Sequence, residues 1–86
     1  MSQRTVVIAS RVGLHARPAS LFTQAVAASG ARVTIAKPGG PSMDASSILM
    51  VMALGVGNGE EVVLESEDEG VLHELVTLLE TDLDAQ

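Results

Sequence analysis

The sequence predicts an α+β fold, an open-faced sandwich in which a four-stranded antiparallel sheet carries three helices on one face. Short β-branched runs bounded by turn formers recur along the chain, and segments with helical periodicity lie between them. The resulting order is βαββαβα, which is typical of a two-layer α+β domain. With 86 residues and no internal repeat or linker, we expect a single domain over residues 1–86.

The first strand and the first helix are predicted from adjacent patterns. Residues 5–9 (TVVIA) are apolar and β-branched, as is typical of a strand. Apolar side chains then recur at helical spacing over residues 17–29, while Ser20, Thr23 and Gln24 are expected on the outer face. The apolar stripe comprises Leu21, Phe22, Ala25, Val26 and Ala28. Gly30 should end the helix, because glycine readily adopts the left-handed conformation found there.

The remaining strands and the last helix follow from similar signals. Residues 32–36 (RVTIA) predict the second strand, and the KPGGPS segment predicts a tight reversal into a short third strand at residues 42–44. Residues 61–65 (EVVLE) predict the fourth strand. Leucine and valine side chains at helical spacing predict an amphipathic helix over residues 71–83.

The middle helix, in the segment SSILMVMALG, is apolar on every side over residues 48–54. In a two-layer domain only one side of a short helix can face the sheet. A helical wheel places Val51 and Leu54 on one arc, which we expect in the core. The opposite arc, expected to form a docking patch, holds Ile48, Leu49 and Met52. The alternative is a helix that is buried all round.

Composition excludes several classes of function. A net charge of −6 and a single aromatic residue, Phe22, argue against nucleic-acid binding. The absence of cysteine excludes a disulfide scaffold and a thiolate zinc site. Because the apolar runs are too short for a signal peptide or a membrane span, we expect a cytoplasmic protein without membrane insertion.

The stretch GLHARPAS carries the main signal for a functional site. Pro18 is tolerated in the first turn of a helix, which places His15 at the helix N-terminus or just before it. Backbone N–H groups of about Ala16 and Arg17 and the positive end of the helix dipole then form an anion site. The Arg17 guanidinium can add a planar donor for phosphate oxygens.

These residues leave three interpretations of His15 open: reversible phosphoryl transfer, simple anion binding, or a capping residue without chemistry. All five basic residues precede residue 38 and all acids lie at Asp44 or later, so an anion meets little carboxylate repulsion nearby in sequence. His73 has no third potential ligand near it in sequence, and we interpret it as a surface residue. No metal site is expected.

The motif GLHARPAS, followed some thirty residues later by SSILMVMALG, resembles the HPr family, the histidine-containing phosphocarriers of the bacterial phosphoenolpyruvate-dependent sugar phosphotransferase system. The resemblance covers nearly the whole chain and implies the fold described above. It implies that His15 carries the phosphoryl group on Nδ1 with Arg17 beside it. Enzyme I would be the donor and sugar-specific IIA proteins or domains the acceptors, both docking on Ile48, Leu49 and Met52. Such a carrier needs no cofactor, catalyses no free-standing reaction, and is expected to be a monomer.

The resemblance also implies a regulatory serine at the start of the middle helix, phosphorylated in some bacteria by an ATP-dependent kinase. That serine matches Ser47, whereas the preceding Ser46 departs from the residues common in the family. Two rival functions stay open: a regulatory binding module that does not use His15, and a nitrogen-regulatory paralogue of the carrier. The sequence does not identify the sugars or the IIA partners.

Overall fold

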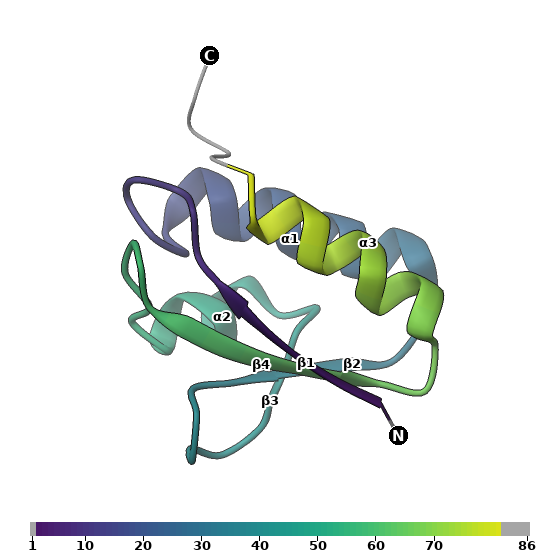
Figure 1. The fold of residues 1–86 in the computed structure, drawn as a ribbon. Coiled ribbons are helices and arrows are strands. Elements are labelled where there is room, and N and C mark those ends of the chain that lie inside the picture. The colour runs from purple at the N-terminus through teal and green to yellow at the C-terminus, as the bar shows by residue number, and fades with distance from the viewer. Residues whose placement is uncertain (1, 82–86) are drawn as a thin grey trace.

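The structure is a computed structural model that describes residues 2–81, and it confirms the predicted α+β class. One antiparallel sheet has the strand order β1-β4-β2-β3. Figure 1 shows α1 and α3 side by side over one face of this sheet, and α1 packs against both α2 and α3. The elements in chain order are β1 (Ser2–Val7), α1 (Ala16–Ser29), β2 (Val33–Ala36), β3 (Met43–Asp44), α2 (Ile48–Ala53), β4 (Glu61–Ser66) and α3 (Glu69–Leu79).

The register of the sheet determines where the chain leaves it. β1 pairs with β4 from Ser2 opposite Ser66 to Val7 opposite Glu61. The predicted first strand, residues 5–9, is therefore placed too far along the chain. The backbone N–H of Ala9 donates to Leu79 of α3, not to a strand, so the chain has left the sheet by that residue. The segment that leads to His15 starts from this end of β1.

α1 is rotated slightly from the predicted orientation. Leu21 and Ala28, expected in the apolar stripe, are exposed, while Thr23, expected on the outer face, is only 7% exposed. Burial of Thr23 is tolerated because its hydroxyl donates to the Ser20 carbonyl at 3.1 Å. As predicted, Gly30 ends the helix in the left-handed conformation, with φ 71°.

The other helices are shorter than the sequence predicts. α3 begins after Asp68, whose carboxylate accepts a hydrogen bond from the Val71 N–H at 3.1 Å, and it ends at Leu79. The predicted end of that helix, at residue 83, lies outside the described residues. None of the helices within residues 2–81 combines the length and apolarity that a membrane span requires.

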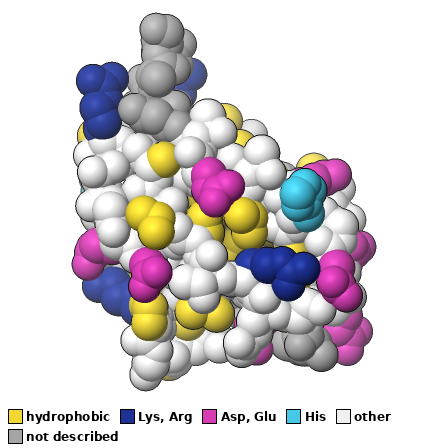
Figure 2. Space-filling view, viewed as in Figure 1, with side chains coloured by type: hydrophobic (Ala, Val, Ile, Leu, Met, Phe, Trp, Pro, Cys, Tyr) yellow, Lys and Arg dark blue, Asp and Glu magenta, His cyan; other side chains and the backbone are white. Residues whose placement is uncertain are grey.

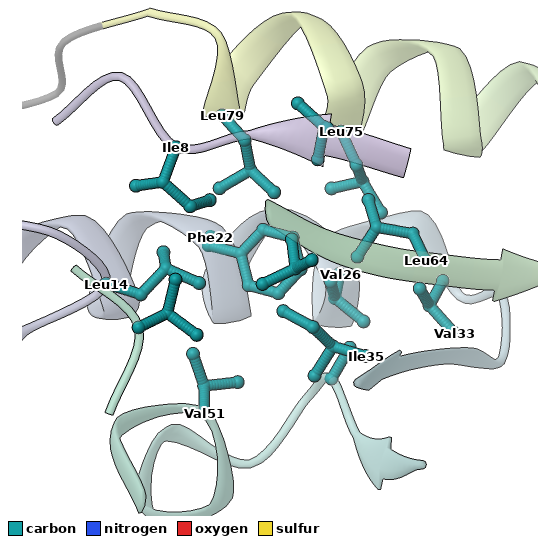
Figure 3. Close-up of a cluster of buried hydrophobic side chains, with 14 of the residues drawn as sticks. Ile8, Leu14, Phe22, Val26, Val33, Ile35, Val51, Leu64, Leu75 and Leu79 are labelled. Carbon is teal, nitrogen blue, oxygen red and sulfur yellow. The ribbon is translucent and has the colours of Figure 1, made fainter. Parts of the chain in front are cut away.

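Within residues 2–81, one cluster of buried side chains joins the sheet to the three helices. Figure 3 shows Phe22 of α1 at its centre, with Leu75 and Leu79 of α3 on one side and Val51 of α2 on the other. These four side chains are between 0% and 2% exposed. Each side chain of this size stabilises the fold by roughly 1.5–3 kcal/mol when it is fully buried. The core therefore fixes the relative positions of α1 and α2, the two elements that carry the predicted site.

Candidate functional site

His15 occupies the N-cap position, directly before α1. Its backbone is extended, with φ −120° and ψ 164°, and its carbonyl accepts the Ala19 N–H at 3.2 Å. The side chain is exposed, and it makes no capping hydrogen bond to the helix. Since Pro18 is buried in the first turn, the structure agrees with the placement predicted from proline. The imidazole is thus held at the helix start by its backbone alone, and the ring faces solvent.

Ala16 and Arg17 follow His15 directly in the first turn of α1. Ala16 has φ 22°, a positive value that residues with a side chain rarely adopt. Arg17 is exposed, as His15 is. The first N–H groups of a helix have no intrahelical acceptor, and the helix dipole adds partial positive charge there. This end of α1 therefore suits an anion bound next to the His15 ring.

The segment before His15 is seated on the loop between α2 and β4. Leu14 is buried, and its N–H donates to the Val56 carbonyl at 2.9 Å. Gly13 has φ 74°, and a Cβ there would lie 2.7 Å from the Cα of Gly57. Only glycine fits both this conformation and this close approach. The approach of two backbones therefore determines where His15 emerges.

α2 contributes an exposed apolar surface that differs in part from the predicted one. Ile48, Leu49 and Met50 are 38%, 79% and 46% exposed, and we call these three residues the α2 patch. Met52, predicted on the exposed arc, is half-buried and packs against the core. The reason is that Met52 and Leu54 flank the fully buried Val51 on either side of the helix. Met50 was missed because an all-apolar helix carries no polar residue that marks its outer face.

The start of α2 carries two serines with different partners. The Ser47 hydroxyl accepts the Met50 N–H at 3.4 Å and so caps the helix. Ser46 donates to Asp44 Oδ1 from both its hydroxyl and its backbone N–H. These two hydrogen bonds hold the pKa of the Asp44 carboxyl below its usual value of 3.8, and the charge of Arg32 lowers that pKa further.

The residues of the predicted anion site, His15, Ala16 and Arg17, are all exposed. A hollow between β2, β4 and the start of α3 is lined by Arg32, Ser66 and Asp68 among others, but by no residue of the GLHARPAS motif. On the face seen in Figure 2, hydrophobic side chains form small areas set among backbone and other side chains, with a few charged side chains beside them. His73 is exposed on α3, and within residues 2–81 no cluster of potential ligands could hold a metal ion. An open site of this kind suits a protein partner better than a small molecule.

The class that this fold and surface define is a small α+β protein with an exposed histidine at the start of a helix. The family model described as PTS HPr component phosphorylation site matches residues 2–81. The chain therefore belongs to the HPr family, the phosphocarrier proteins of the phosphotransferase system. A member of this family carries a phosphoryl group and is not a catalyst by itself, and membership implies interaction with enzyme I and IIA components.

Individual relatives agree with this assignment. The chain is 50% identical over 70 residues to the phosphocarrier protein HPr of Streptomyces coelicolor, covering 81% of this chain and 75% of that protein. It is 37% identical over 71 residues to the phosphocarrier protein HPr of Treponema pallidum, covering 80% of each chain. The crystal structure of HPr-C-His from Thermoanaerobacter tengcongensis superposes with a TM-score of 0.89 at 34% identity, covering 100% of this chain and 99% of that one.

Proposed function

We propose that this protein accepts a phosphoryl group from phosphorylated enzyme I on His15 and passes it to IIA proteins or domains. The observation that carries the proposal is the exposed His15 side chain at the start of α1, which the helix does not use as a cap. A ring nitrogen, Nδ1 by the family resemblance, attacks phosphorus. The P–N bond to His15 forms as the bond to enzyme I breaks, and the reverse exchange occurs at the IIA acceptor.

The neighbours of His15 stabilise the charge of the transferred group. The Arg17 guanidinium and the backbone N–H groups of Ala16 and Arg17 are the donors closest to the ring in sequence, and both are suited to phosphate oxygens. Donors of this kind favour charge that develops during transfer. They also favour the phosphorylated product, so the group can be held and then released to the next partner.

Docking is assigned to the apolar surface of α2. Leu49 is the most exposed large hydrophobic residue of the α2 patch, at 79%, and a side chain of this type gains most from being covered by a partner. Met52, inferred from the family resemblance as a docking residue, is half-buried and would contribute less area than Met50. We also propose that the protein acts as a single-domain monomer and uses no cofactor.

Ser47 is the candidate for regulatory phosphorylation by a serine kinase. It stands directly before the α2 patch and caps the helix, so a phosphate there would change the docking surface without entering the core. Ser46 is a less suitable candidate, because its hydroxyl already donates to Asp44 at 2.7 Å.

The rival function is a regulatory binding module that uses the α2 patch but not the histidine. The presence of His15, Arg17 and Pro18 together favours the carrier, because a module that only docks needs none of the three. A carrier in a nitrogen-regulatory branch would keep all three, and partner identity alone distinguishes it.

A direct test is to incubate the protein with enzyme I and phosphoenolpyruvate and to measure its intact mass. We expect one added phosphate that is stable in base and labile in acid, as a phosphoramidate is. A protein that takes up no phosphate, or takes it up only in an acid-stable form, would contradict the proposed function.

A further inference from the structure

Asn58, in the loop between α2 and β4, holds the segment that leads from β1 to His15. Its side-chain amide Nδ2 lies 3.1 Å from the Ala9 carbonyl oxygen and 3.2 Å from the Ser10 carbonyl oxygen. The Ile8 carbonyl oxygen is farther away, at 3.5 Å. Because an amide nitrogen carries two hydrogens, it can satisfy the two nearer carbonyls at once. One side chain thus binds successive backbone groups some 50 positions earlier in the chain.

Backbone hydrogen bonds from the same loop hold both ends of this segment. At its start, Ile8 exchanges hydrogen bonds with the loop, from its N–H to Glu60 and from the Gly59 N–H to its carbonyl, both at 2.9 Å. At its end, the Leu14 N–H donates to Val56 at 2.9 Å. Between these anchors the chain makes a turn that the Gly13 N–H closes on the Ser10 carbonyl at 2.9 Å. That carbonyl is one of the two that Asn58 binds.

We infer that Asn58 is a positioning residue for phosphoryl transfer at His15, an inference that rests on the proposed carrier function. Without it, the carbonyls of Ala9 and Ser10 lose the side-chain donor that links them to the loop between α2 and β4. The turn at residues 10–13 would then sample more orientations. Because Leu14 connects this turn to His15, the orientation of His15 would vary as well. Transfer between two proteins requires the nitrogen and phosphorus to be aligned, so loss of orientation lowers the rate of the chemical step.

A positioning role and a purely structural role of Asn58 predict different measurements. Asn58 is exposed and does not belong to the hydrophobic core, so its removal should leave the fold largely intact. It also lies outside the α2 patch, so its removal should not change the affinity for enzyme I. The expected effect is therefore on the maximal transfer rate, with little change in the half-saturating concentration of enzyme I or in the melting temperature.

The test is single-turnover transfer from phosphorylated enzyme I, at a series of enzyme I concentrations, to wild type, Asn58→Ala and Asn58→Asp. We expect a maximal rate about tenfold lower for Asn58→Ala. Asn58→Asp should be slower still, because it places an acceptor where two carbonyl oxygens need a donor. Thr77→Ala is the matched control, since it also removes one side-chain hydrogen bond to a backbone carbonyl, that of His73 on α3. This control should transfer at the wild-type rate.

Two further readouts separate positioning from loss of stability. Amide hydrogen exchange over residues 9–14 should quicken in Asn58→Ala while exchange in β4 stays unchanged. The deficit of Asn58→Asp relative to Asn58→Ala should narrow as pH falls, because a protonated carboxyl can donate one hydrogen bond. Equal maximal rates for wild type and both variants, or a change confined to the half-saturating concentration, would overturn this inference alone. No phosphate uptake by wild type would instead overturn the carrier function and any role of Asn58 in transfer.

Discussion

Ser46 donates two hydrogen bonds to one oxygen of Asp44: its hydroxyl lies 2.7 Å and its backbone nitrogen 2.9 Å from Oδ1. The next residue, Ser47, has a different partner, because its hydroxyl accepts the Met50 N–H at the start of α2. Two adjacent serines are thus held by unrelated contacts. A negative charge introduced at one position is therefore expected to differ in its effects from the same charge at the other.

Ser47→Asp should keep the melting temperature or raise it slightly. Aspartate is among the best N-cap residues, and an acid at a helix start stabilises by about 0.3–1 kcal/mol. The new carboxylate borders the α2 patch, where an approaching partner would have to desolvate it. We therefore expect transfer from phosphorylated enzyme I to slow by about tenfold or more, as measured by timed transfer assays beside thermal melts.

Ser46→Asp is the matched control for that variant. It replaces a hydroxyl donor by a carboxylate next to Asp44, so the melting temperature should fall, while transfer should slow less than in Ser47→Asp. Equal transfer rates for wild type and Ser47→Asp would show that the residue at the helix start is no switch and that partners dock elsewhere.

The Asp44 contact predicts a pH dependence of stability. Hydrogen bonds from Ser46 hold the folded-state pKa of Asp44 below the usual value of 3.8, which the unfolded chain should show. The folded protein then binds fewer protons than the unfolded chain in this range, so the contact stabilises the fold above pH 3.8 and is lost as pH falls through the folded-state pKa. Asp44→Asn keeps the acceptor oxygen but removes the charge. The stability difference between wild type and this variant should be constant at neutral pH and shrink below pH 3.8, as measured by thermal melts at each pH. A difference that does not vary with pH would contradict the assignment.

The sequence predicts the two ends of α1 well, because both depend on the backbone preferences of single residues. Pro18 and Gly30 restrict the backbone whatever surrounds them, and both ends of α1 agree with expectation. The rotation of a helix depends instead on what packs against it. Thr23 is buried because its hydroxyl finds a backbone acceptor, and Met52 turns inward because it lies beside Val51.

Contacts between distant loops are the second kind of feature that local patterns cannot indicate. Asn58 reads as an ordinary turn residue in the sequence VGNGE, and nothing in that stretch points to residues 8–10. The end of β1 also depends on a distant contact, since the Ala9 N–H donates to the Leu79 carbonyl of α3 and not to a strand. Such pairings follow from the topology of the whole sheet.

His15→Ala should abolish uptake of acid-labile phosphate from enzyme I while leaving the melting temperature nearly unchanged. The side chain is exposed and makes no capping hydrogen bond, so the fold does not depend on it. His73→Ala is the control, because His73 is also an exposed histidine. It should accept phosphate as wild type does. Phosphate uptake by His15→Ala, detected by intact mass, would mean that another group carries it.

Leu49→Asn should weaken docking without changing the chemistry. Leu49 is 79% exposed, so a polar side chain of similar size costs little stability. Covering it is expected to contribute about 1–2 kcal/mol to a complex, which corresponds to a rise of about tenfold in the half-saturating concentration of enzyme I. The maximal transfer rate should stay the same. Val7→Thr, at an exposed apolar residue of β1 outside the α2 patch, should change neither quantity.

Gly13→Ala tests whether backbone approach positions His15. A Cβ at this position would lie 2.7 Å from the Cα of Gly57, in a backbone conformation with φ 74°. Gly39→Ala is the control, because Gly39 has φ 78° with nothing within 4 Å of a Cβ and lies in the loop between β2 and β3. The stability of the control should fall only by the conformational cost of the positive φ, about 1–2 kcal/mol, and the control should transfer phosphate normally.

Gly13→Ala carries the same conformational cost plus the steric collision, so we expect its stability to fall by about 3 kcal/mol or more. Because the Leu14 N–H donates to Val56, next to Gly57, a shift of either backbone should displace Leu14. The folded fraction should therefore also transfer more slowly at temperatures well below its melting point. Equal melting temperatures for the two variants, measured under the same conditions, would show that the approach of Gly13 to Gly57 is not what holds the histidine in place.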